Sequence, residues 1–241
     1  MATNMLKQLI PLWMYQLKHQ FKHRRFKDRS NTAIFSEIYD SHLWGGDDEQ
    51  FHSGEGTIDE SSRLYLDKLN DFFKTANIQS VVEIGCGDFR LMNTILVNLP
   101  IHYTGIDVVP TLINHLNENF SNDRISFMYA DAVTDALPTA DVCIIRQVLQ
   151  HLSNDQILSI LSKCQQYQYV IITEHLPIGA NIIPNKNKQS GPDVRMYFHS
   201  GVFIESPPFN QKADILIEYR ADFKTFNKMQ KAVHRTYLIK N

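Results

Sequence analysis

The chain has 241 residues, of which 43% are hydrophobic and 21% are charged, and its net charge is −2. This length suits one well-buried domain, and the composition is that of an ordinary soluble globular protein. No apolar run approaches the roughly 18–20 residues that would span a membrane. The three cysteines, an odd number, indicate a reducing compartment and predict neither a disulfide framework nor a metal site.

Positive charge is concentrated in residues 1–30, which hold seven Lys or Arg residues and one Asp. The first half of this segment is also apolar, and we predict a basic amphipathic helix. Two hypotheses stay open: the helix packs on the rest of the domain or a partner chain, or it lies on an anionic membrane surface. The positive charge is confined to this segment and aromatic residues are sparse within it, so the sequence does not predict nucleic-acid binding. We expect a cytoplasmic protein, which under the second hypothesis is peripheral at the inner face of the membrane. The oligomeric state stays open.

Two helices are predicted next, at Thr32–Asp40 and Glu60–Lys74, from apolar residues at helical spacing. A loop rich in glycine and acids joins them; it contains Trp44 and Ser53-Gly54-Glu55-Gly56. This loop either covers a ligand or simply connects the two helices.

A glycine-rich turn follows the apolar run Val81–Ile84 and reads Gly85-Cys86-Gly87-Asp88. Residues without a Cβ let the backbone turn sharply and approach a ligand closely. Twenty residues after Gly87, Asp107 ends the next apolar run. A strand-end acid at this spacing can accept hydrogen bonds from both hydroxyls of a ribose. Turn and acid together predict a cofactor that contains a nucleoside.

The flanking residues narrow the choice of cofactor. Arg90 stands where dinucleotide-binding turns carry a third glycine, which argues against a pyrophosphate. Glu83, two residues before the first glycine, gives the pattern E-x-G-x-G. This pattern after an apolar strand resembles the first motif of the class I methyltransferases that use S-adenosylmethionine. The resemblance covers roughly Ser80 to Glu174, about two fifths of the chain.

The resemblance implies a role for each motif. Residues of the glycine turn surround the methionine part of the cofactor, Asp107 takes the ribose, and Asp131 after the third apolar run meets the adenine amino group. Gln147, in the turn after the fourth run, faces the transferring methyl group. The complete set of predicted cofactor-binding residues is Glu83, Gly85, Cys86, Gly87, Asp88, Asp107, Val108, Asp131, Ala132 and Arg146.

Strands and helices alternate from residue 79 to 174, which predicts parallel strands with right-handed crossovers. Two more strand-like runs, Asp214–Tyr219 and His234–Ile239, predict an antiparallel terminal pair. The expected fold is a Rossmann-like, three-layer α/β/α domain with seven mostly parallel strands, an antiparallel C-terminal hairpin and extra N-terminal helices. Within a single domain, 31–241, we distinguish 31–78 as helices and covering loop, 79–174 as cofactor-binding core, 175–211 as acceptor lid and 212–241 as terminal strands.

Methyl transfer to a hydroxyl needs a base for its proton. The candidates are His151, which is either a base or a packing histidine, His175 directly after a strand predicted at Tyr169–Thr173, and His199 on the lid. With Gln147 they form the predicted catalytic set. The candidates for binding the acceptor are Asp193, Arg195 and Tyr197.

A narrower resemblance points to the acceptor. Some class I methyltransferases of glycan and cell-surface polysaccharide pathways look similar at Ile38-Tyr39, Leu43-Trp44-Gly45, Ser53-Gly54-Glu55-Gly56, Gly85-Cys86-Gly87-Asp88 and Pro207-Pro208-Phe209-Asn210. An acid common after the fourth strand's arginine is replaced here by Gln147. We therefore expect O-methylation of a sugar, a glycan or another small hydroxylated acceptor. The alternatives are N-methylation of a small molecule or a protein side chain, a NAD-type oxidoreductase, and a non-catalytic interaction module.

Overall fold

The computed structural model describes residues 26–47, 51–54, 60–225 and 228–241. The predicted basic helix at 1–30 lies almost wholly outside the described residues, so both hypotheses for it stay predictions. Of that segment, Ser30 is described: it caps the first helix after it by accepting a hydrogen bond from the backbone N–H of Ala33, at 3.2 Å.

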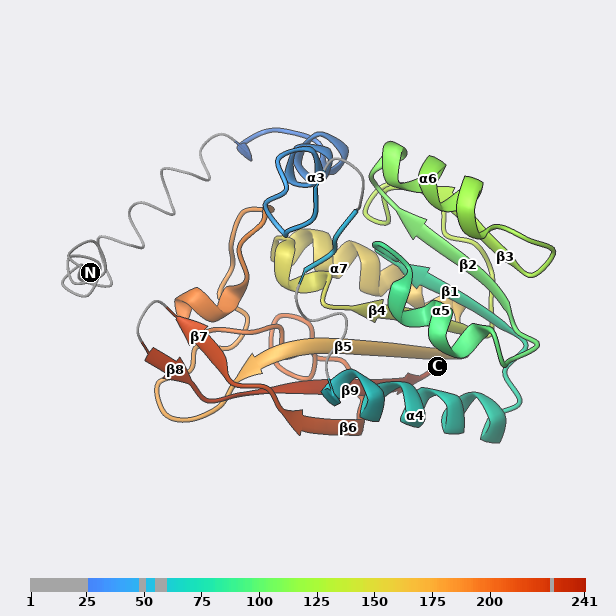
Figure 1. The fold of residues 1–241 in the computed structure, drawn as a ribbon. Helices are drawn as coiled ribbons and strands as arrows, with labels where there is room; N and C mark the ends of the chain where they lie inside the picture. Colours follow the sequence, from blue (N-terminus) through green and yellow to red (C-terminus); the bar gives the residue numbers. More distant parts are fainter. Residues whose placement is uncertain (1–25, 48–50, 55–59, 226–227) are drawn as a thin grey trace.

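A seven-stranded sheet runs through the middle of the molecule (Figure 1), in the order β3-β2-β1-β4-β5-β9-β6. Its strands are β1 Ser80–Ile84, β2 His102–Asp107, β3 Ile125–Tyr129, β4 Val142–Arg146, β5 Tyr169–Pro177, β6 Asp214–Arg220 and β9 Ala232–Lys240. Strands β1 to β5 pair in parallel, whereas β9 is antiparallel to both β5 and β6. The prediction of a mostly parallel sheet with an antiparallel C-terminal pair is confirmed.

Helices flank the sheet (Figure 1): α3 Asn31–Asp40, α4 Glu60–Thr75, α5 Arg90–Leu96, α6 Pro110–Phe120 and α7 Asn154–Lys163, with short 3-10 helices at η4 Leu149–His151, η5 Cys164–Gln166 and η6 Arg195–Phe198. Local sequence explains several of their starts. Pro110 opens α6, where its missing N–H costs nothing. Ser153 and Gln156 form a capping box at the start of α7.

The central strands β1 and β4, which lead into turns of the site, are buried. The β1 residues Val81, Val82 and Ile84, and all four of Val142–Ile145 in β4, are at most 2% exposed. Central parallel strands that are covered on both faces read as continuous apolar runs, which is why these strands could be predicted. They hold the turns at their carboxyl ends in fixed positions.

Two features of the C-terminal half differ from prediction. Strand β5 continues to Pro177, because β9 pairs with every residue from Tyr169 to Pro177. His175 therefore lies inside the strand and not after it, and the segment predicted as a lid begins later than residue 175. A small hairpin, β7 Phe223–Thr225 and β8 Lys228–Gln230, also interrupts the connection between β6 and β9.

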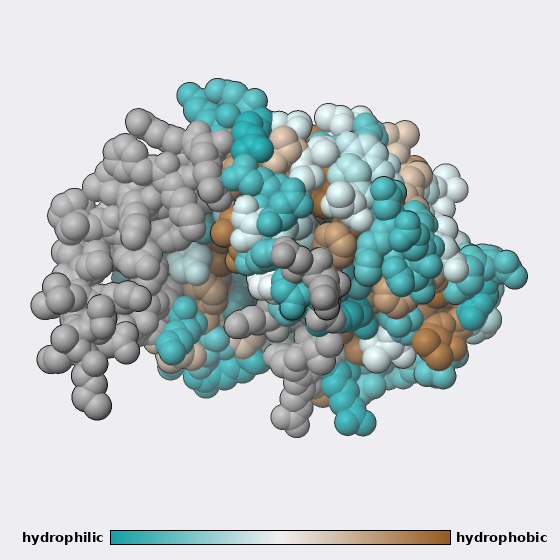
Figure 2. All heavy atoms as spheres, turned by 45° about the horizontal axis from the view of Figure 1, so that its top comes forward, coloured by the Kyte–Doolittle hydropathy of each residue, from teal (hydrophilic) through white to brown (hydrophobic). Residues whose placement is uncertain are grey.

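No helix in the described ranges is long and apolar enough to cross a membrane. Figure 2 shows polar and apolar side chains intermixed on the face that the view presents. Such scattered apolar residues are usual on a protein surface.

Candidate functional site

A cavity of about 1050 Å³ lies beyond the carboxyl ends of the parallel strands, where open α/β sheets bind ligands. All ten predicted cofactor-binding residues line it. So do Gln147, His151, His175, Asp193 and Tyr197, whereas Arg195 and His199 do not. The volume lies at the upper end of the range for small-molecule sites, so it suits a nucleoside cofactor together with an acceptor.

Neither glycine of the turn has room for a side chain. Gly85 and Gly87 have φ angles of +68° and +54°, in the left-handed region. A Cβ on Gly85 would lie 2.5 Å from Cγ2 of Val148, and one on Gly87 would lie 2.5 Å from Oγ of Ser53. The turn thus packs between Val148, which follows β4, and Ser53 in the loop before α4. It lines the cavity.

Two buried carboxyl groups stand beside this turn. Asp107 accepts hydrogen bonds from the backbone N–H groups of Gly87, at 3.3 Å, and Val109, at 3.1 Å. Burial raises its pKa to about 6. Glu83 accepts a hydrogen bond from the Tyr103 hydroxyl, and burial raises its pKa to about 7. Because both groups are already removed from bulk water, a positive charge or a hydroxyl donor that bound there would not require their desolvation again.

Asp131 is hydrogen-bonded by a residue near the N-terminal end of the described chain. The Asn31 amide nitrogen at the start of α3 donates to both Asp131 carboxylate oxygens, at 3.2 and 3.1 Å. Gln156 in α7 donates in turn to the Asn31 amide oxygen, at 2.9 Å. The three elements together form the end of the cavity that receives the adenine in the predicted arrangement. Asn31 was not predicted as a site residue, because its role depends on where α3 packs.

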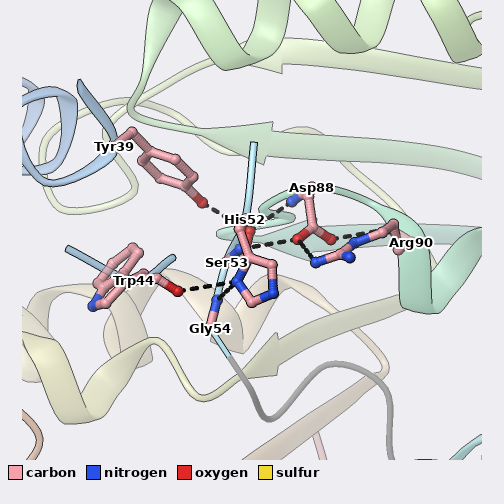
Figure 3. A network of polar contacts seen from close by, with 7 residues as sticks. All are labelled: Tyr39, Trp44, His52, Ser53, Gly54, Asp88 and Arg90. Atoms are coloured by element: carbon pink, nitrogen blue, oxygen red, sulfur yellow. Dashed lines mark hydrogen bonds and ion pairs between the residues drawn. The ribbon is translucent and has the colours of Figure 1, made fainter. Parts of the chain in front are cut away.

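The loop before α4 closes over the glycine turn, and Figure 3 shows the network that holds it. Ser53 and Asp88 exchange two hydrogen bonds: the Ser53 N–H donates to Oδ2 of Asp88 at 2.9 Å, and the Asp88 N–H donates to Oγ of Ser53 at 2.8 Å. The Tyr39 hydroxyl lies 2.9 Å from the same Oγ, and Arg90 pairs with Asp88 at 2.7 Å. Of the two roles that the sequence left open for this loop, the geometry favours the covering one.

The opposite end of the cavity is built from aromatic and imidazole rings. His175 on β5 places Nε2 2.6 Å from the backbone oxygen of Ala221, and its ring centroid lies 4.5 Å from that of His234 on β9. Phe223 on β7 packs between His175 and Tyr197, at centroid distances of 5.6 and 5.2 Å. His234 and Phe223 were not predicted, since their place here depends on the pairing of the last strand and on the small hairpin.

Gln147 holds an unusual backbone conformation at the end of β4. Its φ is +57°, which side chains rarely adopt. Its N–H donates to the Thr173 backbone oxygen at 2.7 Å, and its side-chain Nε2 lies 3.2 Å from Nε2 of His234. Non-glycine residues held in this region cluster at functional sites.

Comparison with known proteins gives the family. The family model of the O-methyltransferase domain matches residues 14–206, most of the chain. The chain belongs to this family. An uncharacterised methyltransferase of Mycobacterium tuberculosis is 26% identical over 96 residues, which are 39% of this chain and 48% of the relative. The chain thus spans about half the length of the curated relatives it matches.

Solved structures agree on the fold of this methyltransferase domain. The N-methyltransferase NodS of Bradyrhizobium japonicum, in complex with S-adenosylhomocysteine, aligns with a TM-score of 0.59 and 13% identity, over 88% of this chain and 100% of that one. The magnesium protoporphyrin IX methyltransferase of Synechocystis, also with S-adenosylhomocysteine, aligns with a TM-score of 0.52 and 13% identity over the same shares. The predicted class I methyltransferase fold is confirmed.

His151 lies in the methyltransferase cavity, but its surroundings favour packing. Its ring centroid lies 4.9 Å from that of Trp44, and Nδ1 lies 3.3 Å from the Gly191 backbone oxygen. Burial, followed by the charge of Lys188, lowers its pKa to about 3. An imidazole with so low a pKa is a weak base at neutral pH, so of the two hypotheses for this residue the structure supports the packing one.

Arg195 and His199 do not line the cavity. Arg195 is 1% exposed, and its guanidinium donates to the backbone oxygens of Leu152 and Lys186, each at 2.7 Å, and to Oδ1 of Asn154 at 2.8 Å. His199 is exposed in the turn that ends η6. The predicted acceptor contact of Arg195 is thus replaced by a structural one: its side chain turns inward and ties the lid segment to the start of α7.

Replacing Arg195 by Ala should therefore lower the free energy of unfolding by about 2–4 kcal/mol, because it strands buried acceptors that a charged donor now satisfies. Urea unfolding followed by circular dichroism measures this change. Arg63→Ala, an exposed arginine on α4, is the matched control and should leave the midpoint nearly unchanged. Equal midpoints for wild type and Arg195→Ala would contradict the structural role.

Proposed function

We propose that this domain methylates a hydroxyl group of a small acceptor, a sugar or glycan, with S-adenosylmethionine as cofactor. The observation that carries the proposal is His175, a neutral imidazole whose orientation is fixed and whose ring borders the cavity. It supplies the base that a hydroxyl acceptor needs and that a neutral amine acceptor does not.

The residues at the other end fit the proposed cofactor. Its methionine part carries an ammonium group, its ribose two adjacent hydroxyls and its adenine an amino group, all of them donors. The cavity offers a carboxyl group for each, Glu83, Asp107 and Asp131, at the ends of adjacent strands β1, β2 and β3. Burial of Glu83 and Asp107 also favours a ligand of positive charge over an anionic pyrophosphate.

The chain's own contribution to the reaction is alignment and proton transfer. When bound, S-adenosylmethionine supplies the methyl group: the acceptor oxygen bonds to the methyl carbon as the carbon–sulfur bond breaks and its electron pair passes to sulfur. The Ala221 carbonyl can only accept, so Nε2 of His175 carries the ring proton and Nδ1 is left to take the proton of the hydroxyl. Burial lowers the pKa of His175 from its ordinary value of 6.5, which keeps the ring neutral and ready at pH 7.

The proposal predicts binding of S-adenosylhomocysteine and no binding of NAD, both measurable by calorimetry on the full chain. Transfer of radiolabelled methyl groups should then be screened over sugars, glycolipids and small phenols, with the methylated atom identified by mass spectrometry. Label that appears on oxygen supports the proposal. Binding of NAD alone, or label found only on nitrogen, would overturn it.

A further inference from the structure

We propose that Asn31, held by Gln156, is a positioning residue for the cofactor: it orients Asp131 so that the site selects a purine with a 6-amino group over one with a 6-oxo group. This inference rests on the proposed S-adenosylmethionine cofactor and adds to it one residue of α3 and one of α7 that decide which base binds. It follows from the directions of the hydrogen bonds that run from Ser153 through Gln156 and Asn31 to Asp131.

The direction of this chain of hydrogen bonds is set at the capping box of α7. The backbone N–H of Ser153 lies 3.1 Å from one terminal atom of the Gln156 amide, and a backbone N–H can only donate. That atom must therefore be the Gln156 oxygen, which also accepts from the hydroxyl groups of Ser153, at 3.3 Å, and Ser190. The nitrogen of the amide is left to face Asn31, at 2.9 Å.

The orientation of the Asn31 amide follows from that of Gln156. An amide nitrogen can only donate, so the Asn31 atom that faces Gln156 must be its oxygen. The Asn31 nitrogen then faces Asp131 and lies 3.2 and 3.1 Å from its two carboxylate oxygens. An amide turned the other way would set nitrogen against nitrogen and oxygen against a carboxylate. Since Asn31 is only 6% exposed, water has little access to compensate such a mismatch, and one orientation is strongly favoured.

Asp131 is thereby fixed as a group that accepts hydrogen bonds. Its Oδ1 accepts from Asn31 and from the Val133 N–H, at 2.9 Å, whereas among the described residues Oδ2 accepts from Asn31 alone. A carboxylate oxygen has two acceptor positions, so Oδ2 keeps one of them. Both Asn31 and Asp131 line the cavity. In the proposed complex the remaining position accepts the amino group of adenine.

A 6-oxo purine is rejected by the same arrangement. It would present an oxygen to Asp131, and two acceptors with no proton between them repel each other. Asn31 already directs its N–H groups at the carboxylate, so the carboxylate cannot be replaced as the partner of the base by a donor without breaking these bonds. Gln156 is not among the residues that line the cavity, and it reaches the base only through Asn31.

The test compares S-adenosylhomocysteine with S-inosylhomocysteine, in which a carbonyl oxygen replaces the 6-amino group of the base. Calorimetry on the full chain gives both dissociation constants. Contacts with the ribose and the amino-acid part are common to the two ligands and cancel in the affinity ratio. We expect the wild type to bind S-adenosylhomocysteine about 30-fold more tightly, which corresponds to about 2 kcal/mol and lies in the range of a hydrogen bond to a charged group.

Gln156→Glu tests the role of the amide that orients Asn31. Glutamate serves in a capping box as glutamine does, so α7 keeps its cap, but the atom that faces Asn31 becomes an oxygen. The Asn31 amide must then turn its nitrogen to the new carboxylate and its oxygen to Asp131. The affinity ratio of the two ligands should fall about tenfold, a usual size for coupling between residues in one hydrogen-bond network. Gln165→Glu, which adds the same charge at an exposed position of η5, is the matched control and should keep the wild-type ratio.

Asn31→Ala shows whether the effect passes through Asn31. It should lower the ratio as Gln156→Glu does, and combining the two substitutions should lower it no further, because both remove one contact. If Asn31→Ala does not fold, the comparison of Gln156→Glu with Gln165→Glu decides alone.

A wild type that binds both ligands equally would overturn the inference. So would a Gln156→Glu variant that loses affinity for both ligands by the same factor, since a purely structural role lowers the two affinities together, or a Gln156→Glu effect that persists in the Asn31→Ala background. Failure of the wild type to bind S-adenosylhomocysteine would instead overturn the proposed function.

Discussion

Replacing Asp107 by Asn is expected to weaken binding of S-adenosylhomocysteine about 100-fold. The carboxylate already holds the backbone N–H groups of Gly87 and Val109, and in the proposed complex it also accepts two hydroxyl groups. Hydrogen bonds to a charged group are worth about 1.5–3 kcal/mol each, and the amide keeps one uncharged acceptor, so a net loss of about 2.7 kcal/mol is a conservative figure. Calorimetry at pH 7.5 measures the change.

The same carboxyl group sets a pH dependence for cofactor binding. Burial raises the pKa of Asp107 to about 6, so in the free protein it is ionised above pH 6 and protonated below. Hydroxyl donors stabilise the ionised form and lower the pKa in the complex. Asp107 should therefore make the affinity fall by up to tenfold per pH unit below about pH 6. Glu83, whose pKa is raised by burial to about 7, should add a separate fall below about pH 7. Asp107→Asn should lose the first of these two contributions and keep the second.

Asp123→Asn is the matched control for both experiments, because it removes the same charge from an exposed turn before β3. It should leave the affinity and its pH profile as in the wild type. Unchanged affinity in Asp107→Asn would refute the ribose assignment. An equal loss in Asp123→Asn would show that net charge, and not a contact, is responsible.

The cofactor end of the cavity could be predicted because its residues are ordered along the chain. Glu83, Asp107 and Asp131 each lie at or just beyond the end of an apolar run, and parallel strands bring their carboxyl ends to one edge of the sheet. A glycine turn with positive φ angles has a strong local signature as well. These inferences needed only the type and order of the strands, not the contacts between distant segments.

The acceptor end could not be predicted in this way. His234 lies 87 residues beyond Gln147, and it reaches the site only because β9 enters between β5 and β6 in the register that sets it opposite His175. The predicted acceptor contact of Arg195 failed for a different reason, the direction of its side chain. This residue lies at the expected place along the chain, but the backbone oxygens of Leu152 and Lys186 draw its side chain inward, and sequence says little about which way a loop side chain points.

Replacing His175 by Gln should lower kcat by about 100- to 10,000-fold, the usual value of a positioned base. Glutamine can still donate to the Ala221 carbonyl and fill the space beside Phe223, but it cannot take up a proton. In the wild type saturated with S-adenosylmethionine, kcat/KM for the acceptor should be flat above pH 6.5 and fall as the pH drops through the lowered pKa of His175, since protonation removes the base. His151→Gln is the control, because the pKa of that cavity histidine, about 3, makes it a poor base. Its loss of kcat should be much smaller, and its pH profile should keep the acidic limb that His175→Gln loses. Equal losses in the two variants, or an acidic limb that survives in His175→Gln, would contradict the assignment of the base and return the choice to the other polar groups that line the acceptor end.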